Sequence, residues 1–228
     1  MSLRKFKRTC GTLLVCAAAL LADSASAAVL SDNFNDNARD TTLWFGFNAV
    51  TTKFKETTKR LCFQSTSDTN GPKYAGFASN NWTYRGQNNA TFSFDYKVDV
   101  AGLTGSESAA VGVYTIEPDE ATALEVRVIQ KASGRFVQLE LYIDNNSVEV
   151  RSAPVANATG HVEVVYTKST DVMVVKVDGV TKITFNDLNG DYGPFDLEVE
   201  LFGTTKKTSC AYADLWMDNF KLIGTIDN

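Results

Sequence analysis

Two glutamates near the end of the chain are spaced as a carboxylate pair on one face of a β-strand. Glu198 and Glu200 occur in the segment LEVELFG (197–203), and alternate residues of a strand point to the same side. Their Cα atoms are then roughly 6.5–7 Å apart. Retaining glycoside hydrolysis uses two carboxyl groups about 5–5.5 Å apart, one as nucleophile and one as acid/base. The pair is a candidate for this chemistry, and its alternative is two solvated glutamates on an exposed face.

Further polar side chains alternate with apolar ones in two other segments, ALEVRVIQ (123–130) and RFVQLELYID (135–144). If these strands share a sheet, their polar faces present planar hydrogen-bonding groups of the kind that bind sugars. An aromatic platform at the rim is available from the segment 78–89, ASNNWTYRGQNN. The predicted ligand-binding residues are Glu125, Arg127, Gln138, Glu140, Tyr142, Glu198, Glu200, Trp82 and Tyr84. Ordinary solvation of these faces is the alternative interpretation.

The chain offers little support for chemistry that depends on histidine. His161 is the only histidine of the chain, and it stands at the start of a predicted strand. A Ser–His–Asp hydrolase or a zinc site built on histidines would depend on this one residue. The sequence therefore favours a surface histidine here.

The elements that must position these residues are β-strands. Period-two alternation of apolar and polar residues dominates the chain after residue 28, and we count about a dozen strands. The segment VMVVKVDGVTKITF (172–185) predicts a hairpin, because two β-branched runs meet at Asp178-Gly179. So many antiparallel strands must fold into two packed sheets. We predict one all-β domain, an antiparallel two-sheet jelly-roll sandwich over residues 28–228, with one sheet curved and its outer surface concave.

The first 27 residues read as a secretory signal peptide. A basic start is followed by the apolar run GTLLVCAAALLA and by Ala25-Ser26-Ala27, with small residues at the positions that a signal peptidase reads. We place cleavage near Ala27 and predict a secreted protein, extracellular or periplasmic. No later segment approaches the ~20 apolar residues of a membrane helix.

The charge of the chain excludes some partners. Residues 1–27 hold four basic and one acidic residue, so residues 28–228 carry 18 basic and 26 acidic residues, a net charge of −8. Nucleic acids and anionic membranes both require a basic footprint. We therefore expect neither as a partner, and no stable membrane insertion.

Two cysteines, Cys62 and Cys210, remain after residue 27. An even count in an oxidising compartment predicts a disulfide between them. Such a bridge would place an early strand beside the penultimate region of the chain.

Three segments together resemble the concanavalin A-like superfamily, which contains lectins, laminin-G domains and glucanases. These are LSDNFNDNARDTTLW (30–44), GHVEVVYTKSTDVMVVKVDGVTKITF (160–185) and DLWMDNFKLIG (214–224). The first looks like the start of secreted members, the second like the back half of the domain, and the third like the last strand. The resemblance covers essentially all of residues 28–228 and implies that the N- and C-terminal strands lie side by side.

The resemblance also allows the chain to be compared with the catalytic residues of enzymes that have this fold. Glucanases of this fold carry a third acidic group on the catalytic strand, where this chain has Phe202. Jelly-roll polysaccharide lyases carry Arg, Gln-x-His and Tyr; Arg127, Gln138 and Tyr142 are of the right types, but Gln-x-His is absent. Domains of this resemblance often hold one structural Ca²⁺ between the first and last strands. Asp218 matches the last-strand ligand, and Asp32 (or Asn33) lies at the opposite end.

Three functions follow for this chain. The first is a secreted, non-catalytic domain that binds extracellular glycan. The second is a glycoside hydrolase or polysaccharide lyase that uses Glu198 or Glu200 with Glu140 or Glu125. The third is a structural or adhesive module without a small ligand.

Overall fold

The structure is a computed structural model, and it describes residues 27–47, 52–65, 74–80, 83–85, 88–117, 122–144, 146–186, 196–205 and 214–227. All regular elements in these ranges are β-strands. They are β1 (Ala28–Asp32), β2 (Trp44–Phe47), β3 (Thr52–Thr57), β4 (Arg60–Ser65), β5 (Tyr74–Ser79), β6 (Thr83–Arg85), β7 (Ala90–Val98), β8 (Ser108–Ile116), β9 (Thr122–Lys131), β10 (Gly134–Ile143), β11 (Asn146–Pro154), β12 (Thr159–Thr167), β13 (Val172–Val177), β14 (Val180–Phe185), β15 (Asp196–Thr205), β16 (Leu215–Gly224) and β17 (Ile226–Asp227).

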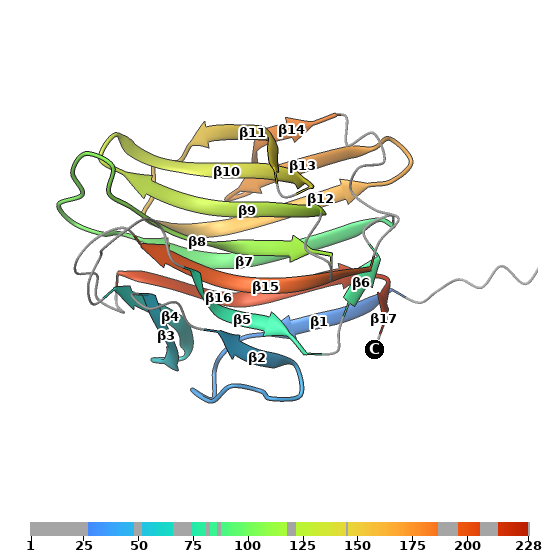
Figure 1. The fold of residues 1–228 in the computed structure, drawn as a ribbon, viewed down its shortest axis with the longest axis horizontal. Coiled ribbons are helices and arrows are strands. Elements are labelled where there is room, and N and C mark those ends of the chain that lie inside the picture. The colour runs from blue at the N-terminus through green and yellow to red at the C-terminus, as the bar shows by residue number, and fades with distance from the viewer. Residues whose placement is uncertain are drawn as a thin grey trace, which may run out of the picture.

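The strands form two antiparallel sheets that lie one in front of the other (Figure 1). Sheet A has eight strands in the order β14-β13-β12-β7-β16-β4-β3, with β1 also paired to β16. Sheet B has nine strands in the order β11-β10-β9-β8-β15-β5-β2, with the short strands β6 and β17 attached beside β15. The predicted all-β jelly-roll sandwich is confirmed. The strands outnumber the predicted dozen partly because β6 and β17 have only three and two residues.

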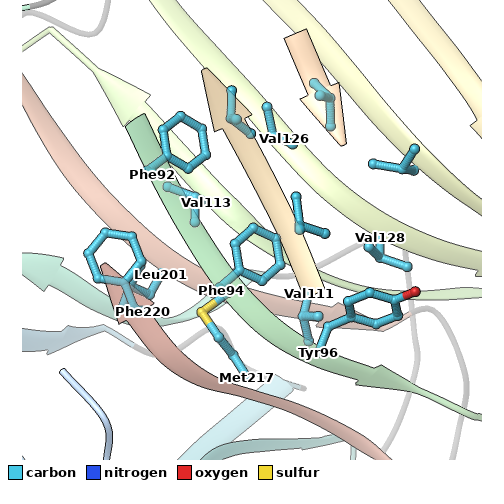
Figure 2. Packing of buried hydrophobic residues seen from close by; sticks show 14 of the residues in the cluster. Phe92, Phe94, Tyr96, Val111, Val113, Val126, Val128, Leu201, Met217 and Phe220 are labelled. Carbon is cyan, nitrogen blue, oxygen red and sulfur yellow. The ribbon is translucent and has the colours of Figure 1, made fainter. Parts of the chain in front are cut away.

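The core is the layer between the inner faces of the two sheets. In β7 the burial alternates without a break, so Phe92, Phe94 and Tyr96 are buried while the residues between them are partly exposed. Figure 2 shows these side chains facing Val111 and Val113 of β8. Since burial of apolar surface is the main favourable term in folding, this alternation fixes which side chains remain on the outer faces.

The predicted hairpin at Asp178-Gly179 is present. Val177 pairs with Val180, and Asp178 and Gly179 have φ angles of 51° and 76°. Positive φ at both central residues is the requirement of a type I′ turn, which Asp-Gly satisfies at low steric cost. The hairpin forms the edge of sheet A, as β13 and β14.

The ends of the described chain meet in sheet A. Strand β1 pairs antiparallel with β16, Asp32 opposite Phe220 and Ala28 opposite Gly224. The neighbouring half of β16 pairs instead with β4, Trp216 opposite Cys62. The expected neighbourhood of the N- and C-terminal strands is therefore confirmed.

The change of partner occurs at a β-bulge in β16. The register with β7 shifts between Asp218 and Lys221, and Asn219 has a φ of 49°. Asn tolerates this left-handed conformation better than most residues. The extra residue lets Met217 and Phe220 both point inward, although three positions separate them.

No helix in the described part of the chain is long and apolar enough to cross a membrane. Residues 1–26 lie outside the described ranges, so the signal peptide remains a prediction.

Candidate functional site

The outer face of sheet B brings together seven of the nine residues predicted to bind ligand. Glu125 stands opposite Glu140 and Arg127 opposite Gln138 across β9 and β10. On the other side, Tyr114 of β8 lies between Glu125 and Glu200 of β15. The seven residues on this face are Glu125, Arg127, Gln138, Glu140, Tyr142, Glu198 and Glu200.

Arg127 is the centre of a hydrogen-bonded cluster, here called the Arg127 network. Its Nε and Nη2 donate to Gln138 Oε1 at 2.9 and 2.7 Å, and Nη2 also donates to Glu140 Oε2 at 3.1 Å. Its Nη1 donates to Glu125. The Ser147 hydroxyl donates to Glu140 Oε1 at 2.7 Å. The guanidinium thus holds two carboxylates and an amide around it, as its fork of donors allows.

Glu125 is the most buried charged residue of the network, with 1% of its surface exposed. Burial raises the pKa of its carboxyl to about 7, with a smaller increase from the charge of Glu140, while Arg127 opposes the shift. The close approach of the β8 backbone at Gly112 makes this packing possible. A Cβ added to Gly112 would lie 2.7 Å from Arg127 Cβ and 2.5 Å from the Val126 oxygen, so glycine allows β8 to approach here.

Aromatic rings surround the network, and sequence reasoning missed most of them. Tyr114 packs edge-on against Tyr142 with ring centroids 5.9 Å apart, and Tyr74 packs against Phe202 at 4.9 Å. The Tyr74 hydroxyl donates to Glu125 Oε2 at 3.4 Å. Burial, followed by the nearby charge of Glu125, raises the pKa of Tyr74 to about 12, so it remains a donor at neutral pH. Only the alternation of β5 and β8 could have indicated Tyr74 and Tyr114.

Two predicted aromatic residues cannot be placed at this face. Trp82 lies outside the described residues. Tyr84 belongs to β6, where its backbone pairs with Leu197 and Ile226, and nothing is described of its side chain.

The register decides which carboxylates are neighbours. Glu200 lies two strands from Glu125, so their Cα atoms are about 10 Å apart at the usual strand spacing. The directly facing carboxylates are Glu125 and Glu140, and Arg127 donates to both.

The two predicted calcium ligands, Asp32 and Asp218, lie near the junction of β1 and β16, and each has protein partners there. Asp32 accepts hydrogen bonds from the Phe34 amide at 2.8 Å and from Trp44 Nε1 at 2.9 Å. Asp218 lies 3.9 Å from Arg60 Nε instead. Among the described residues, no group of three or more His, Cys, Asp or Glu side chains is positioned to hold a metal ion.

An oxygen-rich hollow of about 580 Å³ nevertheless lies beside Asp32, and Asp36 and Asp40 also line it. Under this loop, no described group hydrogen-bonds with either carboxyl oxygen of Glu56, and both oxygens are buried. Burial, Asp32 and Asp36, in that order, raise the pKa of Glu56 to about 7. Orphaned carboxyl oxygens beside further carboxylates are the donor type that calcium prefers.

Cys62 is buried and forms no disulfide within the described residues. Its thiol donates to the Thr57 oxygen at 3.5 Å, and burial is the main cause that raises its pKa. Cys210 lies outside the described residues, so the predicted disulfide remains a prediction.

No protein-family model and no curated protein matches this chain. Solved structures do match it in fold. The Emp47p carbohydrate recognition domain is 10% identical over 90% of this chain and 98% of that chain, with a TM-score of 0.58. The apo Crh5 transglycosylase is 11% identical over 90% and 85%, with a TM-score of 0.59. β-Agarase A in complex with oligoagarose is 14% identical over 87% and 91%, with a TM-score of 0.58.

These similarities identify the concanavalin A-like fold, as the sequence resemblance predicted. At such low identity they establish the fold alone. A recognition domain and two carbohydrate-active enzymes share it, so the fold does not choose between binding and catalysis.

Proposed function

We propose that this protein is a secreted, non-catalytic domain that binds extracellular carbohydrate on the outer face of sheet B. The observation that carries the proposal is the Arg127 network. It holds the acceptors and donors of Gln138 and Glu140 in fixed positions beside the rings of Tyr114 and Tyr142. Sugars are bound by planar polar groups that match their hydroxyls together with aromatic faces that cover their apolar sides.

Binding is preferred to hydrolysis because of where the carboxylates lie. A general acid must touch the glycosidic oxygen, and Glu125 has only 1% of its surface exposed. Glu140 is engaged by Arg127 and by the Ser147 hydroxyl, so neither of its oxygens is available as a nucleophile without breaking the network.

Affinity electrophoresis through gels that contain different neutral polysaccharides tests the proposal. We expect one polymer to retard the protein, and we expect Tyr142→Ala and Glu140→Gln to weaken the retardation at least tenfold. Glu163→Gln is the matched control, because Glu163 is an ion-paired glutamate on the outer face of sheet A, 2.5 Å from Lys176 Nζ. Its retardation, measured against a gel without polymer, should equal that of the wild type.

Two outcomes would replace the proposal. Clearing of the polymer around the protein band would establish a polysaccharide-cleaving enzyme. Failure of every polymer to retard the protein would favour a structural or adhesive module that uses this face for protein contact.

We also propose that one structural calcium ion binds at the loop after β1, where Asp32 and Asp36 line the hollow and Glu56 has two buried carboxyl oxygens. The ion would supply positive charge to buried carboxyl oxygens that otherwise have no described partner. Millimolar Ca²⁺ should raise the melting temperature of the wild type and leave that of Glu56→Gln unchanged. An equal rise in both proteins would show that calcium binds elsewhere.

A further inference from the structure

The outer face of sheet A carries a second row of residues that the glycan proposal does not use. Five neighbouring strands contribute one residue each at the same level, and every adjacent pair is in register. We call this the Trp216 row. It consists of Lys55 (β3), Cys62 (β4), Trp216 (β16), Lys97 (β7) and Thr159 (β12).

The row lines a hollow of about 720 Å³, together with Thr57, Thr58 and Arg60 from the β3–β4 turn. Its floor is the buried Cys62 and the partly exposed Trp216. The Arg60 guanidinium carbon lies 4.0 Å from the centre of the Trp216 ring, a cation–π distance. A planar aromatic ring therefore stands beside a planar cation at one end of the hollow.

Positive charge gathers here, although the chain as a whole is acidic. Lys55, Arg60 and Lys97 all line the hollow, and no acidic residue does. Outside the hollow, Asp218 Oδ2 lies 3.9 Å from Arg60 Nε, at the edge of ion-pair distance. Within the described residues, Lys97 has no ion-pair partner. Arg60 and Lys97 are thus the cations on which the inference rests.

We propose that this hollow binds a carboxylate-bearing sugar of an anionic polysaccharide. Arg60 and Lys97 would take the carboxylate, Arg60 by two parallel N–H donors, which match the two oxygens of a carboxylate. Trp216 would contact the apolar side of the sugar ring, and the Thr159 hydroxyl would meet a ring hydroxyl. An isolated inorganic anion would leave the apolar floor without a partner, which is why a sugar is the better occupant.

This site is independent of the proposed site on sheet B, since the two occupy the outer faces of different sheets. The residues of the sheet B face include Glu140, Glu198 and Glu200, which repel a polyuronate. The site on sheet B should therefore bind neutral polymers and the site on sheet A anionic ones. A substitution can remove either site without removing the other.

Affinity electrophoresis and titration calorimetry of the purified protein with polygalacturonate test this inference. We expect retardation that weakens with added salt, and we expect Arg60→Gln/Lys97→Gln to lower the affinity at least tenfold. Lys221→Gln is the matched control, because Lys221 is an exposed cation of the same sheet outside this hollow; its affinity should stay within twofold of the wild type. Circular dichroism melting of each variant checks that it folds.

Each other outcome overturns the inference. If the protein fails to bind polygalacturonate, or if the double variant keeps wild-type affinity, the proposed site in this hollow is refuted. Equal retardation by dextran sulfate would show that the protein binds polyanions in general, and would refute specificity for a carboxylate-bearing sugar. If Tyr142→Ala abolishes polygalacturonate binding while Arg60→Gln/Lys97→Gln does not, the ligand sits on sheet B; binding of a neutral polymer remains the separate test of the proposed function.

Discussion

The outer faces of the two sheets handle charge in opposite ways. On sheet B, Arg127 has a side chain 14% exposed and donates to carboxylates on both sides. On sheet A, Arg60 has a side chain 42% exposed and rests on Trp216, and among the described residues only Asp218 lies within ion-pair distance of it, at 3.9 Å. The first arginine is a structural member of a closed network, whereas the second remains accessible to a ligand.

The difference teaches how to separate structural charges from binding charges on a β-sandwich. A buried ion pair is strongly destabilised when one partner is removed, because the other charge remains in a poorly solvated place. An exposed pair contributes little to stability, so its charge is available for recognition. Stability measurements on matched variants of the two faces should therefore diverge.

The largest expected effect is that of Arg127→Ala. Removal of the guanidinium leaves Glu125 buried beside Glu140 without compensation, and we expect the free energy of unfolding to fall by about 3–5 kcal/mol. Urea denaturation at pH 7.5 measures it. A loss below about 1 kcal/mol would mean that the two faces do not differ as described.

A smaller effect should appear in the pH dependence of stability. Because the folded-state pKa of Glu125 is raised from 4.5 to about 7, the folded protein holds a proton that the unfolded chain has released. The free energy of unfolding should therefore fall as pH rises through this window, with a contribution from Glu125 on the order of 2 kcal/mol.

Glu125→Gln should remove that contribution, while a residual slope of the same sign remains from Glu56, whose pKa is also raised to about 7. Urea titrations of both proteins at pH 4.5, 6 and 7.5 compare the slopes. Parallel curves for wild type and variant would refute the assignment to Glu125.

The smallest expected effect is that of Arg60→Ala on sheet A. Loss of an exposed cation–π contact and a long ion pair should lower the free energy of unfolding by about 0.5–1 kcal/mol. Thermal melts beside Arg127→Ala provide the direct comparison. Similar losses in the two variants would remove the distinction between a structural and an accessible arginine.

The sequence was most informative where local alternation decides the structure. The polar faces of 123–130 and 135–144 placed Glu125, Arg127, Gln138 and Glu140 on one surface, and the structure confirms that placement. The hairpin at Asp178-Gly179 was predictable for the same reason, because its turn chemistry is local.

What the sequence did not reveal depends on pairing between distant strands. Alternation shows that Glu125 and Glu140 point outward, but only the register of β9 and β10 makes them neighbours that share Arg127. The Trp216 row draws on five strands spread over more than a hundred positions, so no local pattern could assemble it. Asp218 was assigned to calcium from its place in the last strand, and only the pairing of β16 with β4 shows that it also lies 3.9 Å from Arg60.

That bulge has a consequence for changes in chain length. Substitution of Asn219 would alter one exposed turn residue, but its deletion would restore a strict two-residue alternation along β16. Leu215 and Met217 would then still point to the same side as Phe220 and Leu222, the side on which both pairs are now buried. Deletion of Asn219 should therefore be tolerated, whereas deletion of Lys221, which leaves the bulge in place, would turn Leu222 toward water, and a deletion scan of β16 should show one tolerated position at the bulge.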